Sequence, residues 1–442
     1  MKVRTLIALI TAIALICSGT VATIHQPATG TAVASTSSTV QPSDSYVLEQ
    51  GGECRRIEPL QSGESIEEFY DYRNHETHPE DVERRYSSHG TTHLQEDDTS
   101  ILFLHEGTNG TSLVMVHDRL GGETSGGVVT FDIVGLPSDA EWVVQDDLYD
   151  GETNMVEWYR GERYAGASWI WSESRTDGGA IRGGLDDDFA VTIHPAFNED
   201  AEHYDNDDLH DPDYFEDGEL TEWEALSGSA EDPDRTTLSM DEPVTIRTGT
   251  CDDPSVSYER TDDGISATVT GAEPDDRVAV TPTTGSNDAI EFEEVELRDV
   301  ESDGSISFVN GQTDVPKTSP NGVESFTDLT ITTDGGISDA AATVSFTVNG
   351  SYLEDREIEP ERVALYVQDG ETWTESPTTL RDESGDSYRF TANVTSLSTV
   401  TVAPAQENEG AAPSSLYGIG LGLTVGTLLC IGLLITAKRR RG

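Results

Sequence analysis

The 442-residue chain carries 84 Asp and Glu against 26 Lys and Arg, a formal net charge of −58 at pH 7. This charge excludes nucleic acid as a partner, because proteins bind the phosphate backbone through basic side chains. It does not describe a disordered acidic chain either, since 14 Tyr, 11 Phe and 6 Trp are distributed among the carboxylates.

Residues 1–34 have the pattern of a secretory signal peptide. Two basic residues precede an apolar run from Leu6 to Ile16, and a small-residue stretch ending at Ala34 supplies a signal-peptidase site. We therefore expect residues 1–34 to be removed on export. Residues 35–50, rich in Ser and Thr, are predicted to form a flexible leader.

A first domain is predicted over residues 51–252, with one cysteine near each end. Cys17 leaves with the signal peptide, and Cys430 falls in an apolar segment near the C-terminus. Cys54 and Cys251 therefore remain for an oxidising compartment, and we expect them to form one disulfide that closes this domain.

The predicted elements of this domain are almost all strands. A short helix is expected over Glu64–Tyr72, with Ser65 as its N-cap and Glu68 three residues later. An Asn-Gly hairpin turn at residues 109–110 follows. The predicted strands are Ile101–His105, Ser112–His117, Val128–Val134, Glu141–Gln145, Ala167–Trp171, Phe189–His194 and Thr236–Arg247.

Strands at this spacing, separated by turn residues, favour a β-sandwich or barrel. The Gly-rich stretch at residues 121–127 is interpreted as a hairpin loop between two of the strands. Four tryptophans are expected to fill the core or its rim: Trp142, Trp158, Trp169 and Trp171. An exposed sugar-stacking platform on Trp169 and Trp171, two residues apart on one strand face, is the alternative.

A second domain is predicted over residues 255–404. Val363–Val367 reads as a strand, Asp369-Gly370 as a hairpin turn and Thr372–Thr374 as the returning strand. The order of motifs resembles the PGF-pre-PGF β-domain of archaeal cell-surface proteins. The motifs are Thr268–Pro274, Phe326–Ile331, Val344–Val348, Tyr352-Leu353, Val363–Tyr366, Trp373-Thr-Glu and Thr378–Leu380.

That resemblance implies an envelope location and a β fold, but no defined reaction. The chain departs from the family at Ser396–Thr399, where the Pro-Gly-Phe tripeptide would stand. We therefore expect a mainly β protein, with two β-sandwich-like extracellular domains and one C-terminal transmembrane helix.

The transmembrane helix is predicted over residues 416–437, after a polar stalk at residues 405–415. Its 22 uncharged residues span about 33 Å as a helix, enough to cross a hydrocarbon core of about 30 Å. The basic tail at residues 438–442 is predicted to be cytoplasmic. Gly418, Gly422 and Gly426 lie every fourth residue along one face and predict helix pairing in a homodimer, with ordinary membrane-helix filler as the alternative.

Six of the 26 basic residues lie in the signal and the tail, so the exported part sets 20 basic residues against all 84 acidic ones, a net charge of −64. In molar salt the Debye length is about 3 Å and the mutual repulsion is screened. The composition resembles that of secreted proteins from extremely halophilic archaea.

Three sequons predict N-glycosylation, at Asn109, Asn349 and Asn393, although chance alone supplies a similar number. Metal sites are weighed at the acidic stretch 199–219, at Asp186–Asp188 and at the His75/His78 and His89/His93 pairs. A solvated halophilic surface explains all of these more simply. No motif predicts a catalytic residue or a cofactor.

These features favour a non-enzymatic, membrane-anchored surface glycoprotein that acts as an envelope component or binds surface glycans or other envelope proteins. The alternatives are a membrane-tethered hydrolase or metal-dependent carbohydrate-active protein with its site in the first domain, and a spike protein of a halophilic virus.

Overall fold

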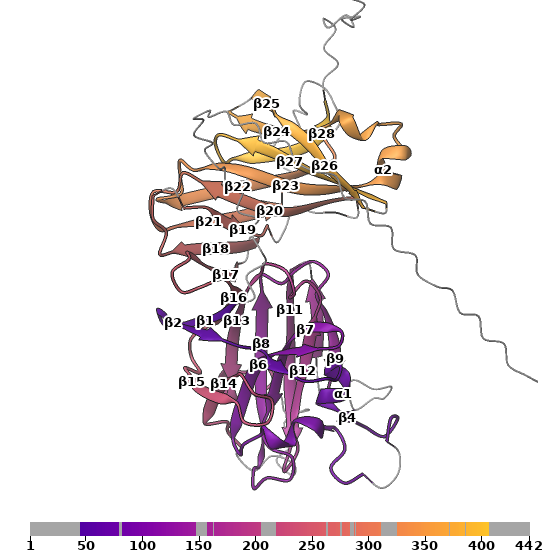
Figure 1. Cartoon of the computed structure of the whole chain (residues 1–442), viewed down its shortest axis with the longest axis vertical. Coiled ribbons are helices and arrows are strands. Elements are labelled where there is room, and N and C mark those ends of the chain that lie inside the picture. Colours follow the sequence, from indigo (N-terminus) through magenta and orange to yellow (C-terminus); the bar gives the residue numbers. More distant parts are fainter. Residues whose placement is uncertain are drawn as a thin grey trace, which may run out of the picture. The chain divides into compact units, whose positions relative to one another are not determined.

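The computed structural model describes residues 45–78, 82–146, 157–161, 163–204, 218–261, 264–274, 276–282, 287, 289–310, 325–370, 372–384 and 386–405. Most of these residues lie in strands, which confirms the predicted mainly β class (Figure 1). The strands up to β16 form two sheets, here called the N-terminal sheet pair. The strands from β17 onward form two others, the C-terminal sheet pair.

The N-terminal sheet pair consists of two seven-stranded sheets. The first has the order β10 (Glu157–Gly161), β11 (Tyr164–Ser172), β8 (Gly126–Val134), β13 (Ala190–Phe197), β16 (Val244–Thr248), β1 (Tyr46–Gln50) and β2 (Glu53–Ile57). The second has the order β15 (Asp234–Leu238), β14 (Glu222–Ser227), β6 (Thr99–Gly107), β7 (Gly110–His117), β12 (Asp177–Arg182) and β9 (Glu141–Gln145), with β3 (Leu60–Gln61) added beside β6. Strands β3 and β14 run parallel to β6, and the other neighbours are antiparallel.

The C-terminal sheet pair is antiparallel throughout the described strands. Its seven-stranded sheet has the order β17 (Ser255–Thr261), β18 (Gly264–Thr270), β21 (Gly304–Asn310), β22 (Thr327–Gly335), β28 (Thr399–Pro404), β24 (Val363–Asp369) and β25 (Thr372–Ser376). Its five-stranded sheet has the order β19 (Val278–Val280), β20 (Ile290–Arg298), β23 (Ala341–Asn349), β27 (Ser387–Val394) and β26 (Thr378–Ser384). The predicted hairpin around Asp369-Gly370 is the β24–β25 pair.

Helices are few and short in the described residues. The predicted first helix is α1 (Ile66–Tyr70), and Ser65 and Glu68 form its complete capping box. The remaining short elements are α2 (Gly350–Glu354), the 3-10 turns η1 (Gly90–His93), η2 (Asn198–Asp200) and η4 (Pro360–Arg362), and the two-residue strands β4 (Tyr72–Arg73) and β5 (Ser87–Ser88).

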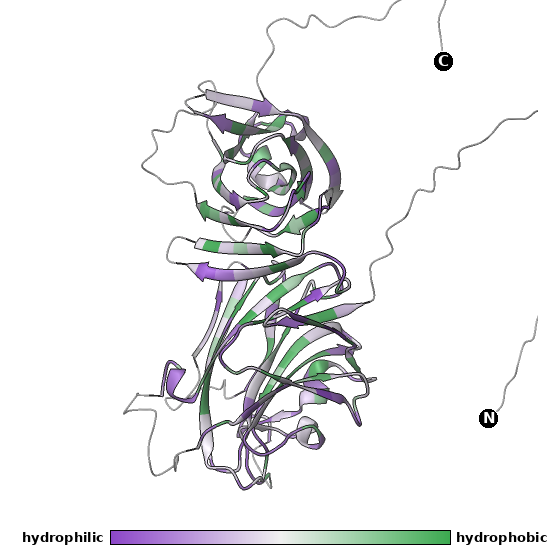
Figure 2. Ribbon diagram, turned by 90° about the vertical axis from the view of Figure 1, so that its left-hand side faces the viewer, coloured by the Kyte–Doolittle hydropathy of each residue, from purple (hydrophilic) through white to green (hydrophobic). Residues whose placement is uncertain are grey.

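Strands β6 and β7 are buried on both faces, which explains their unbroken apolar runs. Leu102 and Leu104 pack with the first sheet, whereas Ile101 and Phe103 pack on the other side with α1. In the C-terminal sheet pair the strands instead alternate, as Ala341–Asn349 does between half-buried and buried positions. Figure 2 shows hydrophobic residues in green recurring along the strands between pale and purple ones.

Two predictions about connections are wrong. The Gly-rich stretch at residues 121–127 is not a hairpin loop, because β7 and β8 belong to different sheets and the chain crosses between them there. The single strand predicted over Thr236–Arg247 is two strands, β15 in one sheet and β16 in the other. Both errors have one cause: local patterns mark strands and turns but do not say to which sheet each strand belongs.

The flexible leader predicted over residues 35–50 is wrong at its end, because residues 46–50 form β1 and pair with both β2 and β16. The predicted signal, leader residues 35–44, stalk residues after Ala405 and segment 416–437 lie outside the described residues, and so do Gly418, Gly422 and Gly426. Within the residues that the structure describes, none of the helices has the length and apolarity needed to span a membrane.

Candidate functional site

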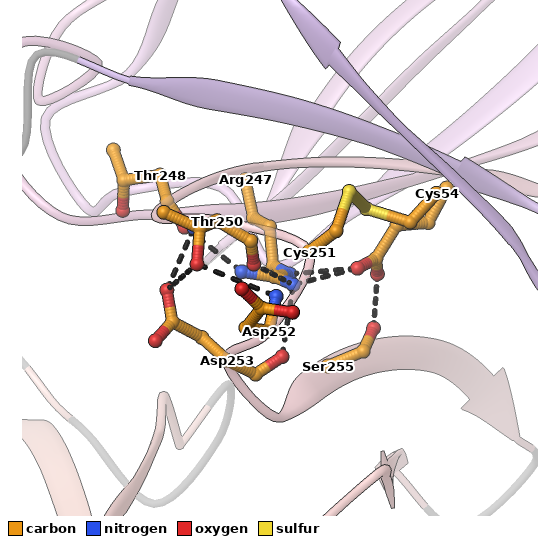
Figure 3. The surroundings of a disulfide bond; sticks show 9 residues. Cys54, Arg247, Thr248, Thr250, Cys251, Asp252, Asp253 and Ser255 are labelled. Carbon is orange, nitrogen blue, oxygen red and sulfur yellow. Dashed lines mark hydrogen bonds and ion pairs between the residues drawn. A yellow bond between two sulfur atoms is a disulfide. The ribbon is translucent and has the colours of Figure 1, made fainter.

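The predicted disulfide between Cys54 and Cys251 is present (Figure 3). Cys54 lies on β2, an edge strand of the first sheet, and Cys251 lies in the connection from β16 to β17. Their Cα atoms are 5.7 Å apart, a usual separation for a disulfide, and both residues are exposed. The bond thus joins the N-terminal hairpin to the point where the chain leaves the N-terminal sheet pair.

Arg247, at 5% side-chain exposure, organises the connection that carries Cys251. Its Nε and Nη2 donate to Oε1 of Glu49 at 3.0 and 2.7 Å. Nη2 also donates to the carbonyl oxygens of Thr250 and Asp253, at 2.9 and 3.1 Å. The dashed lines in Figure 3 converge on this guanidinium, which therefore fixes the loop from both sides of Cys251.

Asp253 stabilises the same loop through hydrogen bonds to Thr250. Its Oδ2 accepts hydrogen bonds from the backbone amide and hydroxyl of Thr250, at 2.6 and 2.9 Å. The hydroxyl of Ser255, at the start of β17, donates to the second carboxylate oxygen of Glu49. We call the disulfide together with Glu49, Arg247 and Asp253 the clasp, because its contacts hold the chain in place.

A groove of about 800 Å³ lies elsewhere in the N-terminal sheet pair. Strands β1 and β2 of the first sheet, β3, β6 and β7 of the second, and the β14–β15 turn all contribute to it. Its lining is mostly polar and includes Tyr46, Arg56, Gln61, Glu106, Asp186 and Glu231. Sequence reasoning missed this groove, because its walls are up to 185 residues apart in the chain.

The structure pairs two serines with histidines, which sequence reasoning also missed. Ser100 and His117 face each other across β6 and β7, with Oγ and Nδ1 2.9 Å apart and neither residue exposed. Burial lowers the pKa of His117 to about 3, so its ring is neutral at pH 7. A nucleophile sealed inside a core meets no substrate, and we assign this pair to packing.

The second pair is Ser62 and His105, whose Oγ and Nε2 are 2.8 Å apart. Burial lowers the pKa of His105 to about 4. Its ring stacks on Phe69, with centroids 4.5 Å apart. Its Nδ1 is buried and has no hydrogen-bond partner in the part of the chain that the structure describes. A Ser-His nucleophile needs a third group to orient the base at that nitrogen, so this pair does not form a triad either.

The four tryptophans lie in the core or at its rim, as expected. Trp169 and Trp171 are 0% and 2% exposed, which rules out the sugar-stacking platform. The indole of Trp171 donates to Oδ2 of the buried Asp118 at 2.9 Å. Trp142 and Trp158 are half-buried at the rim and contact each other edge to face.

The residues weighed for metal binding do not converge. Asp186, Asp187 and Asp188 are all exposed, and Asp186 uses one oxygen to bind Thr111. His75 instead contacts the hydroxyl of Tyr86, and His93 the carbonyl of Ala230. Residues 205–217 lie outside the described part. Within the described part, no group of three or more His, Cys, Asp or Glu side chains is arranged to hold a metal ion.

The three sequons occupy different environments. Asn109 is exposed in the two-residue turn between β6 and β7. Asn349 caps α2, and its Oδ1 accepts from the amide and hydroxyl of Ser351 at 2.9 and 2.8 Å. Asn393 is exposed but lies within β27, and its Oδ1 accepts from the Thr343 hydroxyl at 3.2 Å.

Comparison with known proteins finds no match among family models, curated proteins or solved structures. The resemblance to the PGF-pre-PGF domain therefore stays a prediction.

Proposed function

We propose that this chain is a non-enzymatic surface glycoprotein of a halophilic archaeon, exported and held at the cell membrane by residues 416–437. The clasp is the observation that carries the proposal. Disulfides persist in oxidising compartments and are rare in the cytosol. Cys54 and Cys251 are separated by 197 residues and form a bond of ordinary geometry.

The charge of the chain supports the same proposal. The described part of the chain has far more acidic than basic side chains, and about half of its Arg side chains pair with a carboxylate, as Arg235 does with Glu96 and Glu224. Such a surface is soluble in brine, where its self-repulsion is screened. Within this proposal the β-rich part is an envelope component or a module that binds other surface molecules, and a viral spike of the same plan would share all of these features.

The experiment compares the full chain with a variant that ends at Ser415, both expressed in a halophilic archaeal host. We expect the full chain to stay with the membrane, to lack residues 1–34, and to be digested by protease added to intact cells. The truncated variant should appear in the medium. Protection of the full chain from external protease, or retention of the truncated variant inside the cell, would refute the proposal.

A hydrolase remains the second candidate because of the groove, which brings Glu106, Asp186 and Glu231 to one polar hollow. Two such carboxylates are the usual catalytic pair of a glycosidase. The test is turnover of a glycoside panel by the purified chain in molar salt. Release of sugar that disappears in both Glu106→Gln and Glu231→Gln, while each variant keeps the thermal stability of the parent, would establish this candidate and refute the first.

A further inference from the structure

The turn that carries Asn109 is built into one end of the groove. Thr108 and Asn109 are the two turn residues between the paired Gly107 and Gly110. Gly110 has a φ of 101°, a conformation that side chains rarely adopt. The side chain of Asn109 is exposed at the tip, so an external enzyme can reach its amide.

Asp186 connects this turn to the wall of the groove. Its Oδ1 accepts hydrogen bonds from the backbone amide and the hydroxyl of Thr111, at 2.9 and 2.8 Å. A Cβ atom added at Gly110 would overlap Oδ2 of Asp186. Thr111 and Asp186 both line the groove. At about 3.4 Å per strand residue, Thr111 lies about 7 Å along the chain from Asn109.

We propose that the groove holds the first sugars of a glycan attached to Asn109 of the same chain. This inference rests on the proposed function, because the glycan is added only to an exported chain. The bond forms between Nδ2 of Asn109 and the anomeric carbon of a saccharide phosphate ester, supplied by the glycosylation machinery of the cell. The phosphate leaves with the electron pair of the broken C–O bond, and Nδ2 gives up one proton.

The lining suits an uncharged polyol. Glu106 accepts a hydrogen bond from Gln61 through Oε2 at 2.8 Å. Its other oxygen, Oε1, is the acceptor that the proposal assigns to a sugar hydroxyl. Arg56 is 67% exposed, and its closest acidic oxygen, on Glu58, is 3.7 Å away. Its guanidinium therefore retains donors for ring or hydroxyl oxygens. A sugar hydroxyl can therefore donate a hydrogen bond to a carboxylate of the groove and accept one from the guanidinium.

The other two sequons do not line the groove. Asn393 lies within β27 and Asn349 is engaged in capping α2. A cavity of about 220 Å³ adjoins Asn393, much smaller than the groove beside Asn109. Of the three sequons, the groove-bound glycan is therefore assigned to Asn109.

The test starts with the full chain purified in detergent and molar salt. Glycopeptide mass spectrometry should find Asn109 modified. The glycan is then released chemically from that peptide and used as the probe for a variant with an empty groove, Asn109→Gln. We expect the probe to bind Asn109→Gln at least about ten-fold more tightly than the parent, whose groove its own glycan fills.

Two further variants, made in the Asn109→Gln background, locate the binding. Arg56→Ala should weaken binding of the probe about ten-fold, the effect expected when one hydrogen bond to a charged group is lost. Arg55→Ala, the neighbouring residue on the same exposed strand, is outside the groove and should leave binding unchanged. Equal weakening by both variants, or no binding of the probe to Asn109→Gln, would overturn the inference.

The same preparation separates this inference from the proposed function. The N-terminus of the purified chain, together with protease digestion of the intact cells from which it is purified, reports export independently of any sugar. An exported chain whose Asn109 is unmodified overturns the glycan inference and leaves the surface location standing. A chain that retains residues 1–34 refutes the proposed function itself.

Discussion

Arg247 donates from Nε and Nη2 to a single carboxylate oxygen of Glu49, at 3.0 and 2.7 Å, across 198 residues of sequence. Their side chains are 5% and 16% exposed, so both charges are largely removed from water. Each charge offsets the desolvation penalty of burying the other, and together they fix the loop that carries Cys251.

Breaking this pair should be costly. In Arg247→Met the buried Glu49 carboxylate loses its partner, and the carbonyl oxygens of Thr250 and Asp253 lose a donor. We expect the free energy of unfolding to fall by about 3–5 kcal/mol. Denaturant unfolding in molar salt measures it. The matched control is Arg277→Met, which breaks an exposed pair with Glu296 at 3.1 Å and should cost about 0–1 kcal/mol. Equal losses of unfolding free energy in the two variants would contradict a special structural role for the buried Arg247–Glu49 pair.

Removing the disulfide should destabilise the chain through its unfolded state. For a loop of 197 residues, the chain-entropy model gives about 5 kcal/mol, an upper value for real proteins. We expect Cys54→Ser with Cys251→Ser to unfold at lower denaturant concentration while keeping the far-UV spectrum of the parent. Because Cys54 and Cys251 are exposed, a thiol reductant should reproduce the loss without prior unfolding. A midpoint unchanged by both treatments would refute this prediction.

The indole of Trp171 should matter through its hydrogen bond to Asp118. Trp171→Phe keeps most of the apolar volume but removes a donor to a buried carboxylate, which should cost about 1–3 kcal/mol. Trp373→Phe is the matched control, since the buried Nε1 of Trp373 has no hydrogen-bond partner in the described part of the chain. We expect that change to be close to neutral. Thermal unfolding of both variants decides the matter, and similar Tm losses would count against a specific role for the hydrogen bond.

Stability should decline as the pH falls below the ordinary histidine range. Burial lowers the pKa of His117 to about 3 and that of His105 to about 4, whereas the same side chains titrate near 6.5 when unfolded. The unfolded chain therefore binds more protons between these values, so the stability is complete above about pH 6.5 and is lost on acidification. Each histidine contributes about 1.4 kcal/mol per pH unit.

Denaturant unfolding between pH 6.5 and pH 5 measures that slope. We expect His117→Gln to reduce the slope of the unfolding free energy by about 1.4 kcal/mol per pH unit, the contribution of one bound proton. His78→Gln, in the loop after β4, is the control and should keep the parent slope. His105→Gln repeats the test at a second position in case the first variant folds poorly. A parent-like slope in both core variants would show that the buried histidines do not govern the acid response.

The glycine stripe yields a prediction on the segment outside the described residues. If Gly418, Gly422 and Gly426 let two helices approach closely, replacing all three with Leu should convert a detergent-solubilised dimer to a monomer. Light scattering after size exclusion reports the mass. A parent chain that is already monomeric would show that these glycines are ordinary membrane-helix residues.

Local features of the chain could be predicted wherever the responsible residues are neighbours in sequence. Ser65 and Glu68 cap α1 because they are three residues apart. The Asn-Gly pair correctly indicated a hairpin between β6 and β7, but its two turn residues are Thr108 and Asn109, because Gly110 already pairs with Gly107. The disulfide was predictable for a different reason, since the predicted signal peptide and the predicted transmembrane segment account for the other two cysteines and leave Cys54 and Cys251.

Non-local features were decided by the tertiary structure alone. Nothing in the sequence around Glu49 or Arg247 indicates that these two residues pair. The groove is likewise assembled from strands of both sheets. Ser100 and His117 meet because β6 and β7 pair in one register, which also buries both faces of the hairpin. Composition and spacing indicate where most of the strands form. Which sheet each strand joins depends on the burial of its faces against segments far along the chain, and that choice places the clasp and the groove.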